Sequence, residues 1–211
     1  MIIIKQLRVG IMATFCYIVG DEETMECALI DPAFETNRIL REVDKVGLNV
    51  TSVINTHGHF DHIFGNSKII KATKAKLYIH ELDAALLRKG WIQPITRLMI
   101  RRNPSAPDQL LKDGDLVAIG NETLKVIHTP GHTRGGISLY TPGHVFTGDT
   151  LFINAVGRTD LKGGSLTELI KSIKDKLYCL PDHTIVWPGH DYDSSPNSTI
   201  GQEKKNNPIT R

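Results

Sequence analysis

The sequence predicts an α+β fold, a four-layer αββα sandwich in which two β-sheets stack face to face and helices cover both outer surfaces. Short segments rich in Val, Ile, Tyr and Leu occur in two groups along the chain, and turn residues separate them, which is typical of strands. Segments with one apolar helical face accompany both groups. Pairing the two sheets and placing the helices outside gives every apolar face a partner.

The first half of the chain predicts one of these sheets. Three segments form an expected antiparallel meander, and they cover residues 2–7, 13–20 and 26–31. A surface helix is expected over residues 35–47, because its apolar residues share one stripe and Gly47 favours a left-handed cap. Strands and helices then alternate, over residues 50–54, 64–74, 76–80 and 81–89.

Residues 90–109 interrupt this alternation. They contain Pro94, Pro104 and Pro107 among scattered apolar residues. We expect either an irregular segment that overhangs the site as a lid, or a helix and loop packed on the core.

The second half predicts the other sheet and its helices. Four short strands separated by Gly-Asn or Pro-Gly turns are expected over residues 115–119, 122–128, 136–141 and 143–147. Residues 165–180 form an amphipathic helix that ends before Pro181. A last strand covers residues 184–187, and the polar tail 197–211 is expected to form a short helix or turn against the body.

Length and composition narrow the classes of protein and partner. Residues 1–211 are expected to form a single domain, since 40% of them are hydrophobic and one core suffices for this length. The net charge is only +2, and Lys and Arg are spread along the chain, so neither nucleic acid nor an anionic membrane is expected as a partner. The expected partner is a small molecule, and a homodimer is left open.

The expected location is the cytoplasm. The first residues read as a strand and lack the features of a leader, and no apolar run approaches the roughly 18–20 residues that span a bilayer. Cys16, Cys27 and Cys179 are odd in number and widely spaced, which suits reduced thiols, and the first two are expected in the core.

The strongest chemical signal is the histidine-rich segment 56–62, which reads THGHFDH and follows the apolar strand 50–54. Neutral imidazole and carboxylate groups suit Zn²⁺, Fe²⁺ or Mn²⁺. His57 and His59 are expected to point together from alternate strand positions, while Asp61 and His62 turn toward the same cavity as the strand ends. One segment could therefore serve two adjacent metals, and a solvated histidine-rich loop is the disfavoured alternative.

Three further candidates each follow a glycine at the end of a predicted strand, and they are His132, Asp149 and His190. The glycine lets the backbone approach a metal without side-chain crowding. Together with the first segment they supply five histidines and two aspartates, enough for two metals with one bridging carboxylate and a shared water. The remaining histidines are expected in ordinary structural or surface roles, and they are His80, His128, His144 and His183.

The order THxHxDH, GHT, GDT and GH resembles the metallo-β-lactamase superfamily over essentially the whole chain. The resemblance implies the metallo-β-lactamase fold and two divalent metal ions, Zn²⁺ in the first place and Fe or Mn otherwise. It implies two ligand sets with Asp149 bridging them, namely His57, His59 and His132 on one metal and Asp61, His62 and His190 on the other. Asp61 in place of a cysteine is similar to the hydrolase branch. Asp31, in the sequence LIDP, matches a family aspartate that supports the ligands from behind, with a plain turn residue as the alternative.

Within the superfamily, residues 157–165 and 199–208 resemble the short glyoxalase II-like (hydroxyacylglutathione hydrolase-like) enzymes. The triplet 190–192, His-Asp-Tyr, is similar both to glyoxalase II and to the persulfide dioxygenases. The resemblance therefore implies hydrolysis of a thioester such as S-lactoylglutathione, in which Asp61 orients the attacking hydroxide. Arg158 and Tyr192 are expected to contact the substrate, with a structural salt bridge and a packed hydroxyl as their alternatives.

Two other reaction classes are weighed against the hydrolase. A glutathione persulfide dioxygenase would need one Fe²⁺ on His57, His132 and Asp149, which form a two-histidine, one-carboxylate face. Val156 disfavours it, because the dioxygenases tend to carry cysteine before the Gly-Arg pair. A metallo-nuclease or a non-enzymatic metal-binding module is weaker still, because the chain lacks a basic groove and the ligand set leaves open coordination positions.

Overall fold

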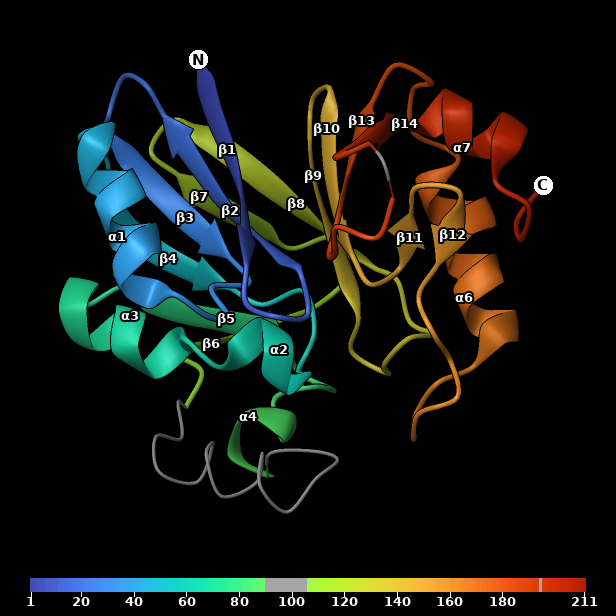
Figure 1. Ribbon diagram of the computed structural model, residues 1–211, viewed down its shortest axis with the longest axis horizontal. Coiled ribbons are helices and arrows are strands. Elements are labelled where there is room, and N and C mark those ends of the chain that lie inside the picture. The colour runs from blue at the N-terminus through green and yellow to red at the C-terminus, as the bar shows by residue number, and fades with distance from the viewer. Residues whose placement is uncertain (90–105, 194) are drawn as a thin grey trace.

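The computed structural model describes residues 1–89, 106–193 and 195–211. Two six-stranded sheets face each other, and helices lie on the outer side of each sheet (Figure 1). The predicted four-layer αββα arrangement is confirmed. Residues 90–105, which hold most of the predicted lid, lie outside the described part of the chain.

The first sheet has the order β1-β2-β3-β4-β5-β6. Its strands are β1 (Ile2–Val9), β2 (Thr14–Asp21), β3 (Glu26–Ile30), β4 (Asn49–Ile54), β5 (Lys76–His80) and β6 (Gln109–Leu111). The first three pair antiparallel, as the meander predicts, and β3, β4, β5 and β6 run parallel to one another. The ends of β3, β4 and β5 therefore lie along one edge of the sheet.

The second sheet has the order β14-β13-β10-β9-β8-β7, and all its pairs are antiparallel except β10 with β13. Its strands are β7 (Leu116–Ile119), β8 (Glu122–His128), β9 (Ile137–Thr141), β10 (His144–Gly148), β13 (Ile185–Pro188) and β14 (Ser198–Thr199). A small hairpin, β11 (Leu151–Phe152) and β12 (Ala155–Val156), follows β10.

Helices cover the two outer faces (Figure 1). The helices beside the first sheet are α1 (Thr36–Lys45), α2 (Phe60–Ile63), α3 (Asn66–Thr73) and α4 (Leu86–Lys89), and those beside the second are α6 (Leu166–Ser172), the π-helix η1 (Ile173–Leu177) and α7 (Ile200–Asn206). Side-chain caps begin the last two α-helices: Ser165 accepts a hydrogen bond from the Glu168 N–H, and Thr199 forms a capping box with Gln202.

Buried residues form one cluster in each of the three spaces between layers. Ile39 of α1 and Ile69 of α3 pack on strand residues such as Leu29. A second cluster lies between the sheets and joins residues such as Ile54 to Phe146. The third cluster joins the α6–α7 layer to the second sheet. The apolar faces predicted from the sequence thus account for the order of the layers.

Four local predictions need correction. The helix predicted over 165–180 divides into α6 and η1, and the helix predicted over 81–89 reduces to turns and α4. Strand β6, which pairs with β5, begins at the last residue of the predicted irregular segment and was not expected. The short strands β11, β12 and β14 were not expected, because two-residue strands carry no measurable periodicity.

The histidines outside the metal-ligand pattern and the first two cysteines match their expected roles. His80 stacks on His128 with ring centroids 4.2 Å apart, and His144 accepts a hydrogen bond from the Trp187 indole. Cys16 and Cys27 are buried. Among the described residues, no helix combines the length and the apolar character needed to cross a bilayer.

Candidate metal centre

The histidine-rich segment leaves the first sheet before its histidines are reached. Strand β4 ends at Ile54, so the prediction that His57 and His59 project from alternate strand positions is wrong. The sheet ladder stops because the Thr56 N–H donates to the Asp31 carboxylate (2.8 Å) instead of to a neighbouring strand. A loop carries the first two histidines, and the one-turn helix α2 carries Asp61 and His62.

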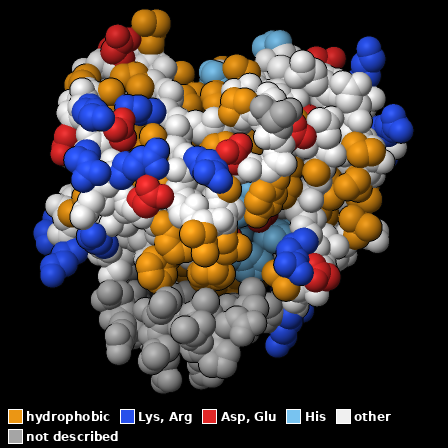
Figure 2. Space-filling view, viewed as in Figure 1, with side chains coloured by type: hydrophobic (Ala, Val, Ile, Leu, Met, Phe, Trp, Pro, Cys, Tyr) orange, Lys and Arg blue, Asp and Glu red, His pale blue; other side chains and the backbone are white. Residues whose placement is uncertain are grey.

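The remaining candidates lie at three separate points of the second sheet. His132 follows β8, Asp149 follows β10, and His190 follows β13. The side chains of all seven candidates are brought together at the edge between the two sheets, and six of the seven residues are buried. In the space-filling view, histidine side chains lie in a recess beside a hydrophobic patch (Figure 2).

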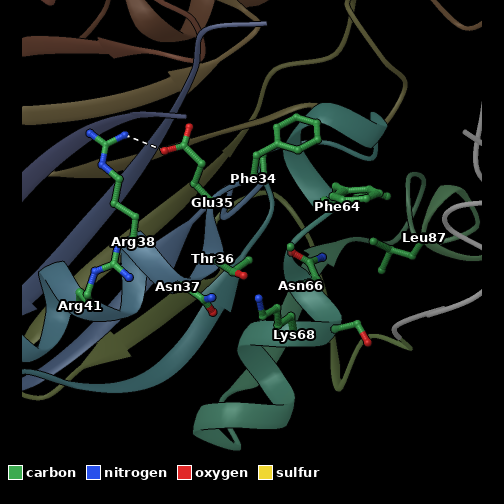
Figure 3. A pocket seen from close by; sticks show the side chains of 14 residues that line it. Phe34, Glu35, Thr36, Asn37, Arg38, Arg41, Phe64, Asn66, Lys68 and Leu87 are labelled. Carbon is green, nitrogen blue, oxygen red and sulfur yellow. Dashed lines mark hydrogen bonds and ion pairs between the residues drawn. The ribbon is translucent and has the colours of Figure 1, made fainter. Parts of the chain in front are cut away.

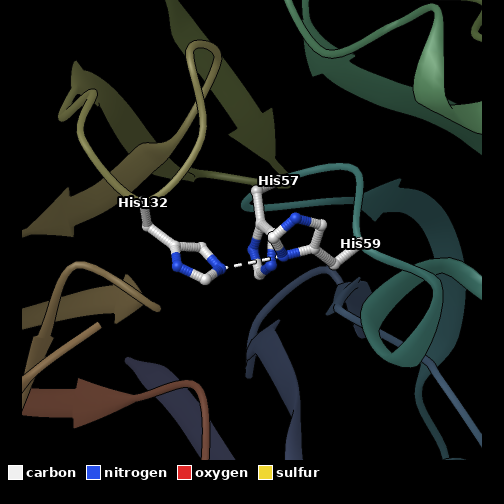
Figure 4. A group of neighbouring side chains, drawn as sticks. All are labelled: His57, His59 and His132. Carbon is white, nitrogen blue, oxygen red and sulfur yellow. Dashed lines mark hydrogen bonds between the residues drawn. The ribbon is translucent and has the colours of Figure 1, made fainter. Parts of the chain in front are cut away.

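The first group of possible ligands consists of His57, His59 and His132. One ligand atom from each lies within 4.8 Å of the others, and the three rings turn toward a common point (Figure 4). Nδ1 of His59 is 2.9 Å from Nε2 of His132. Three imidazoles in this arrangement could hold one divalent metal ion.

The second group consists of Asp61, His62 and His190, whose ligand atoms again lie within 4.8 Å of one another. Nε2 of His62 is 3.1 Å from Nε2 of His190, and the latter is 3.5 Å from Oδ2 of Asp61. Asp31, His57 and His62 also satisfy this spacing. Asp31 is nevertheless placed to support the ligands, because both of its carboxylate oxygens already accept hydrogen bonds.

Asp149 lies between the two groups. Its Oδ2 is 3.4 Å from Nε2 of His132 in the first group and 3.4 Å from Nε2 of His190 in the second. Its Oδ1 is 3.5 Å from Nε2 of His62. One carboxylate therefore faces both groups, which is the geometry of a bridging ligand.

Hydrogen bonds behind three of the histidines assign their tautomers. Nδ1–H of His132 donates to the carbonyl oxygen of Arg158 (2.7 Å), and Nδ1–H of His190 donates to that of Met12 (2.9 Å). Nδ1–H of His62 donates to Oδ2 of Asp31 (2.9 Å). Since Nδ1 holds a proton in each ring, Nε2 is the nitrogen that faces the cavity and can bind a metal.

Thr56 extends this assignment to His57. The Thr56 hydroxyl donates to Oδ2 of Asp31 (2.6 Å), so its oxygen accepts from Nδ1–H of His57 (3.1 Å). Asp31 therefore orients His62 directly and His57 through Thr56, in accord with the supporting role that the sequence predicts.

Two buried atoms in the cavity have no hydrogen-bond partner, namely Nε2 of His57 and Oδ1 of Asp149. Buried polar atoms without partners are rare, and both of these atoms belong to residues that are expected to bind a metal ion. Two pairs of ring nitrogens also face each other, His59 with His132 and His62 with His190. Two lone pairs about 3 Å apart repel unless a proton or a cation lies between them. The residues present therefore fit a pair of bound cations.

The ionisation of the site agrees with this reading. Burial lowers the pKa of His57 well below its usual range and that of His59 to about 3, so both rings are neutral ligands at physiological pH. Burial acts against the charged form of His62 as well, but the carboxylates of Asp149, Asp31 and Asp61 outweigh it and raise the pKa of His62 to about 10. The second group thus favours a positive charge, which a proton or a metal can supply.

The two residues predicted to contact substrate lie at the rim. The Arg158 guanidinium forms a two-bond ion pair with Asp160 (2.7 and 2.6 Å), which is the structural alternative considered for it. The Tyr192 ring stacks on His190 with ring centroids 4.7 Å apart and is 64% exposed. Both remain candidates for substrate contact on the open side of the site.

Asp83 is a functional candidate that sequence reasoning missed. Its buried carboxylate accepts hydrogen bonds from the N–H of Gly58 (2.9 Å) and from the N–H of Gly135 (2.8 Å). The first lies between two ligand histidines of one sheet and the second lies just after His132 of the other. Asp83 therefore joins the two ligand-bearing loops. Sequence spacing does not predict such a contact.

The glycines before two of the ligand candidates, Gly131 and Gly189, lie against other parts of the chain. A Cβ at Gly189 would lie 2.2 Å from Oδ1 of Asp149, and one at Gly131 would lie within 2.3 Å of the backbone of Leu169. Both positions admit close neighbouring protein atoms, and the approach of the backbone to a metal stays a prediction.

Comparison with known proteins identifies the family. The sequence matches the profile of the metallo-beta-lactamase superfamily over residues 9–190. The chain belongs to the metallo-β-lactamase superfamily. Among its relatives, the mitochondrial persulfide dioxygenase ETHE1 of Homo sapiens is 33% identical over 98% of this chain and 75% of its own. The probable metallo-hydrolase YqgX of Bacillus subtilis is 32% identical over 97% of this chain and 96% of its own.

Solved structures show the same fold. The B3 metallo-beta-lactamase BLEG-1 superposes with a TM-score of 0.87 and 32% identity, covering 99% of both chains. TTHA1623 in a di-iron-bound form superposes with a TM-score of 0.82 and 32% identity, covering 97% of this chain and 99% of its own. Both a hydrolase and a dioxygenase therefore occur among the similar proteins.

Proposed function

We propose that this protein is a glyoxalase II-like hydrolase that cleaves a thioester, such as S-lactoylglutathione or a related acyl-thiol, at a centre of two divalent metal ions. The position of Asp149 carries the proposal, because its carboxylate is 3.4 Å from a histidine nitrogen of each ligand group. A bridging carboxylate is useful where two metals act together, whereas a single metal would need only one of the groups.

Each group of ligand candidates would hold one metal ion in this proposal. His57, His59 and His132 would hold one ion, and Asp61, His62 and His190 the other, with Zn²⁺ proposed first and Fe or Mn as alternatives. When bound, the ions supply Lewis acidity that polarises a water molecule and the substrate carbonyl.

The chain's own residues would direct the attack. Oδ2 of Asp61 lies 3.5 Å from Nε2 of His190 in the second group, and its carboxylate would also accept a hydrogen bond from the attacking water and orient it. A thiolate leaves without a general acid, since a thiol has a pKa of about 8.5. Arg158 and Tyr192 at the rim would contact the carboxylate or amide groups of the substrate.

A persulfide dioxygenase is the second candidate, because the human relative is 33% identical over 98% of this chain. That reaction would need one iron on His57, His132 and Asp149, and these residues are also part of the proposed two-metal set. The ligands alone therefore fit both reactions, and a probable metallo-hydrolase is similar to this chain to the same degree.

Paired assays separate the two reactions. The metal-loaded protein is mixed with S-lactoylglutathione while thiol release is followed, and with glutathione persulfide while dissolved oxygen is followed. The proposal expects thiol release without oxygen uptake. Oxygen uptake in proportion to persulfide, with no thiol release from the thioester, would contradict the hydrolase proposal and support the dioxygenase.

A further inference from the structure

A cavity of about 610 Å³ lies outside the metal centre. The loop before α1, helices α1 and α2, the start of α3 and Leu87 surround it, and none of the seven metal-ligand candidates lines it. Its volume is in the range of sites that hold small organic ligands.

Positive charge dominates the polar part of this cavity. Arg38, Arg41 and Lys68 line it, against the single carboxylate of Glu35. That carboxylate is already engaged, because it pairs with Arg38 (2.9 Å) and accepts from the Gly10 N–H (2.9 Å). Within residues 1–89, 106–193 and 195–211, no carboxylate lies within ion-pair distance of Arg41 or Lys68. Among the described residues, these two cationic groups therefore face the cavity without a counter-charge.

The backbone adds to this charge. Helices α1 and α3 both begin at the cavity, and neither has an acidic residue in its first turn or a side-chain hydrogen bond at its cap. The positive end of α3 is thus open to the space that Arg41 and Lys68 line, whereas Glu35 is the N-cap residue of α1.

The other end of the cavity is apolar. The rings of Phe34 and Phe64 lie 5.2 Å apart, and Leu87 lies near them, while Arg41 lies toward the opposite end and Lys68 lies between, beside Asn66 (Figure 3). The Phe64 side chain is 41% exposed, which leaves an aromatic surface free to contact a ligand. Asn37 lies between the two ends and offers an amide group, whereas the buried amide of Asn66 is paired with Asn55.

We propose that this cavity is a binding site for an organic anion that joins a phosphate or carboxylate group to an apolar or aromatic body. The anionic group would bind Arg41 and Lys68, and the apolar body would lie against Phe34 and Phe64. The site is separate from the proposed hydrolysis and does not depend on it.

The cavity is connected to the metal centre through a pair of buried amides. Asn66, which lines the cavity, donates to Asn55 (2.6 Å), and Asn55 donates to the carbonyl oxygen of His62 (3.2 Å). Asn66, in the cavity wall, therefore lies two hydrogen bonds from the backbone of a metal-ligand candidate.

Calorimetric titration of the metal-loaded protein tests the proposal. Phenyl phosphate and benzoate present the two anions on the same ring, and benzyl alcohol is the neutral control. Saturable binding of one or both anions without binding of benzyl alcohol supports the site, and the tighter anion identifies the preferred group. No binding of either anion at millimolar concentration overturns it.

Matched variants locate the binding. Arg41→Gln and Lys68→Gln are each expected to weaken the anion by about tenfold, since each removes a hydrogen bond to a charged group. Lys71→Gln, on the same helix α3 but outside the cavity lining, should leave the affinity unchanged. Binding that survives in both cavity variants but disappears when the metals are removed would place the anion at the metal centre and contradict the proposal.

Discussion

Oδ2 of Asp31 lies 2.9 Å from Nδ1 of His62, and this contact determines which nitrogen of His62 faces the metal centre. The same oxygen accepts from the Thr56 hydroxyl, which in turn orients His57. One carboxylate at the end of β3 therefore orients a ring in each of the two ligand groups.

An asparagine at position 31 keeps one acceptor oxygen, so its NH₂ group would face either the Thr56 N–H or the His62 ring and the Thr56 hydroxyl that orients His57. We expect Asp31→Asn to weaken metal binding by about 10- to 100-fold, because a group that orients a metal-ligating histidine typically contributes that much. Competition with a chromophoric chelator measures the affinity. Asp44→Asn, an exposed aspartate on α1, is the control and should bind metal like the wild type. Equal affinity in both variants would show that Asp31 has no part in orienting the ligands.

Asp83 provides a second test, this time of the contact between the two ligand-bearing loops. An asparagine there can accept from Gly58 or from Gly135, but its NH₂ group would face the other N–H. We expect Asp83→Asn to lower the free energy of unfolding by about 1–3 kcal/mol, the cost of one unsatisfied buried group. Urea denaturation measures this value.

The control for Asp83 is Asp115→Asn, whose carboxylate accepts from the Lys112 N–H in an exposed turn. A smaller loss of stability is expected there, because water can replace the lost contact. If the two variants lose equal stability, the contact of Asp83 with the two loops contributes no more to the free energy of unfolding than a hydrogen bond in a surface turn.

Gly189 tests whether the position of Asp149 matters. A Cβ at this residue would lie 2.2 Å from Oδ1 of Asp149, so Gly189→Ala must displace the carboxylate. We expect thioester hydrolysis to fall by at least about 100-fold, because a shift of about 1 Å in a catalytic group has this effect. Gly201→Ala in α7, whose nearest contact would be 3.0 Å, should keep its activity. Full activity of the Gly189→Ala protein would argue against a bridging role for Asp149.

The sequence predicts the layers well because their cause is local. Apolar residues that repeat on one face, such as Ile39 and Val43 of α1, must be buried, and the three buried clusters follow from that requirement. The seven ligand candidates could also be predicted, since each is a polar residue placed where an apolar strand ends or shortly after.

Other features depend on contacts distant in sequence. Asp83 reaches Gly135 across 52 positions, and nothing in the residues around it differs from an ordinary turn. The early end of β4 also depends on a distant contact. The Thr56 N–H donates to Asp31, 25 residues away, instead of to a neighbouring strand. Periodicity cannot reveal such competition for a backbone donor.

The count of metal ions per chain tests the two-metal centre most directly. Mass spectrometric metal analysis is made on the wild-type protein and on His62→Ala, which removes a side chain of the second group only. We expect about two ions per chain in the wild type and about one in His62→Ala, with thioester hydrolysis reduced by orders of magnitude in the variant. The two-metal hydrolase would be contradicted by one iron per wild-type chain, if both the iron content and the turnover stay unchanged in His62→Ala.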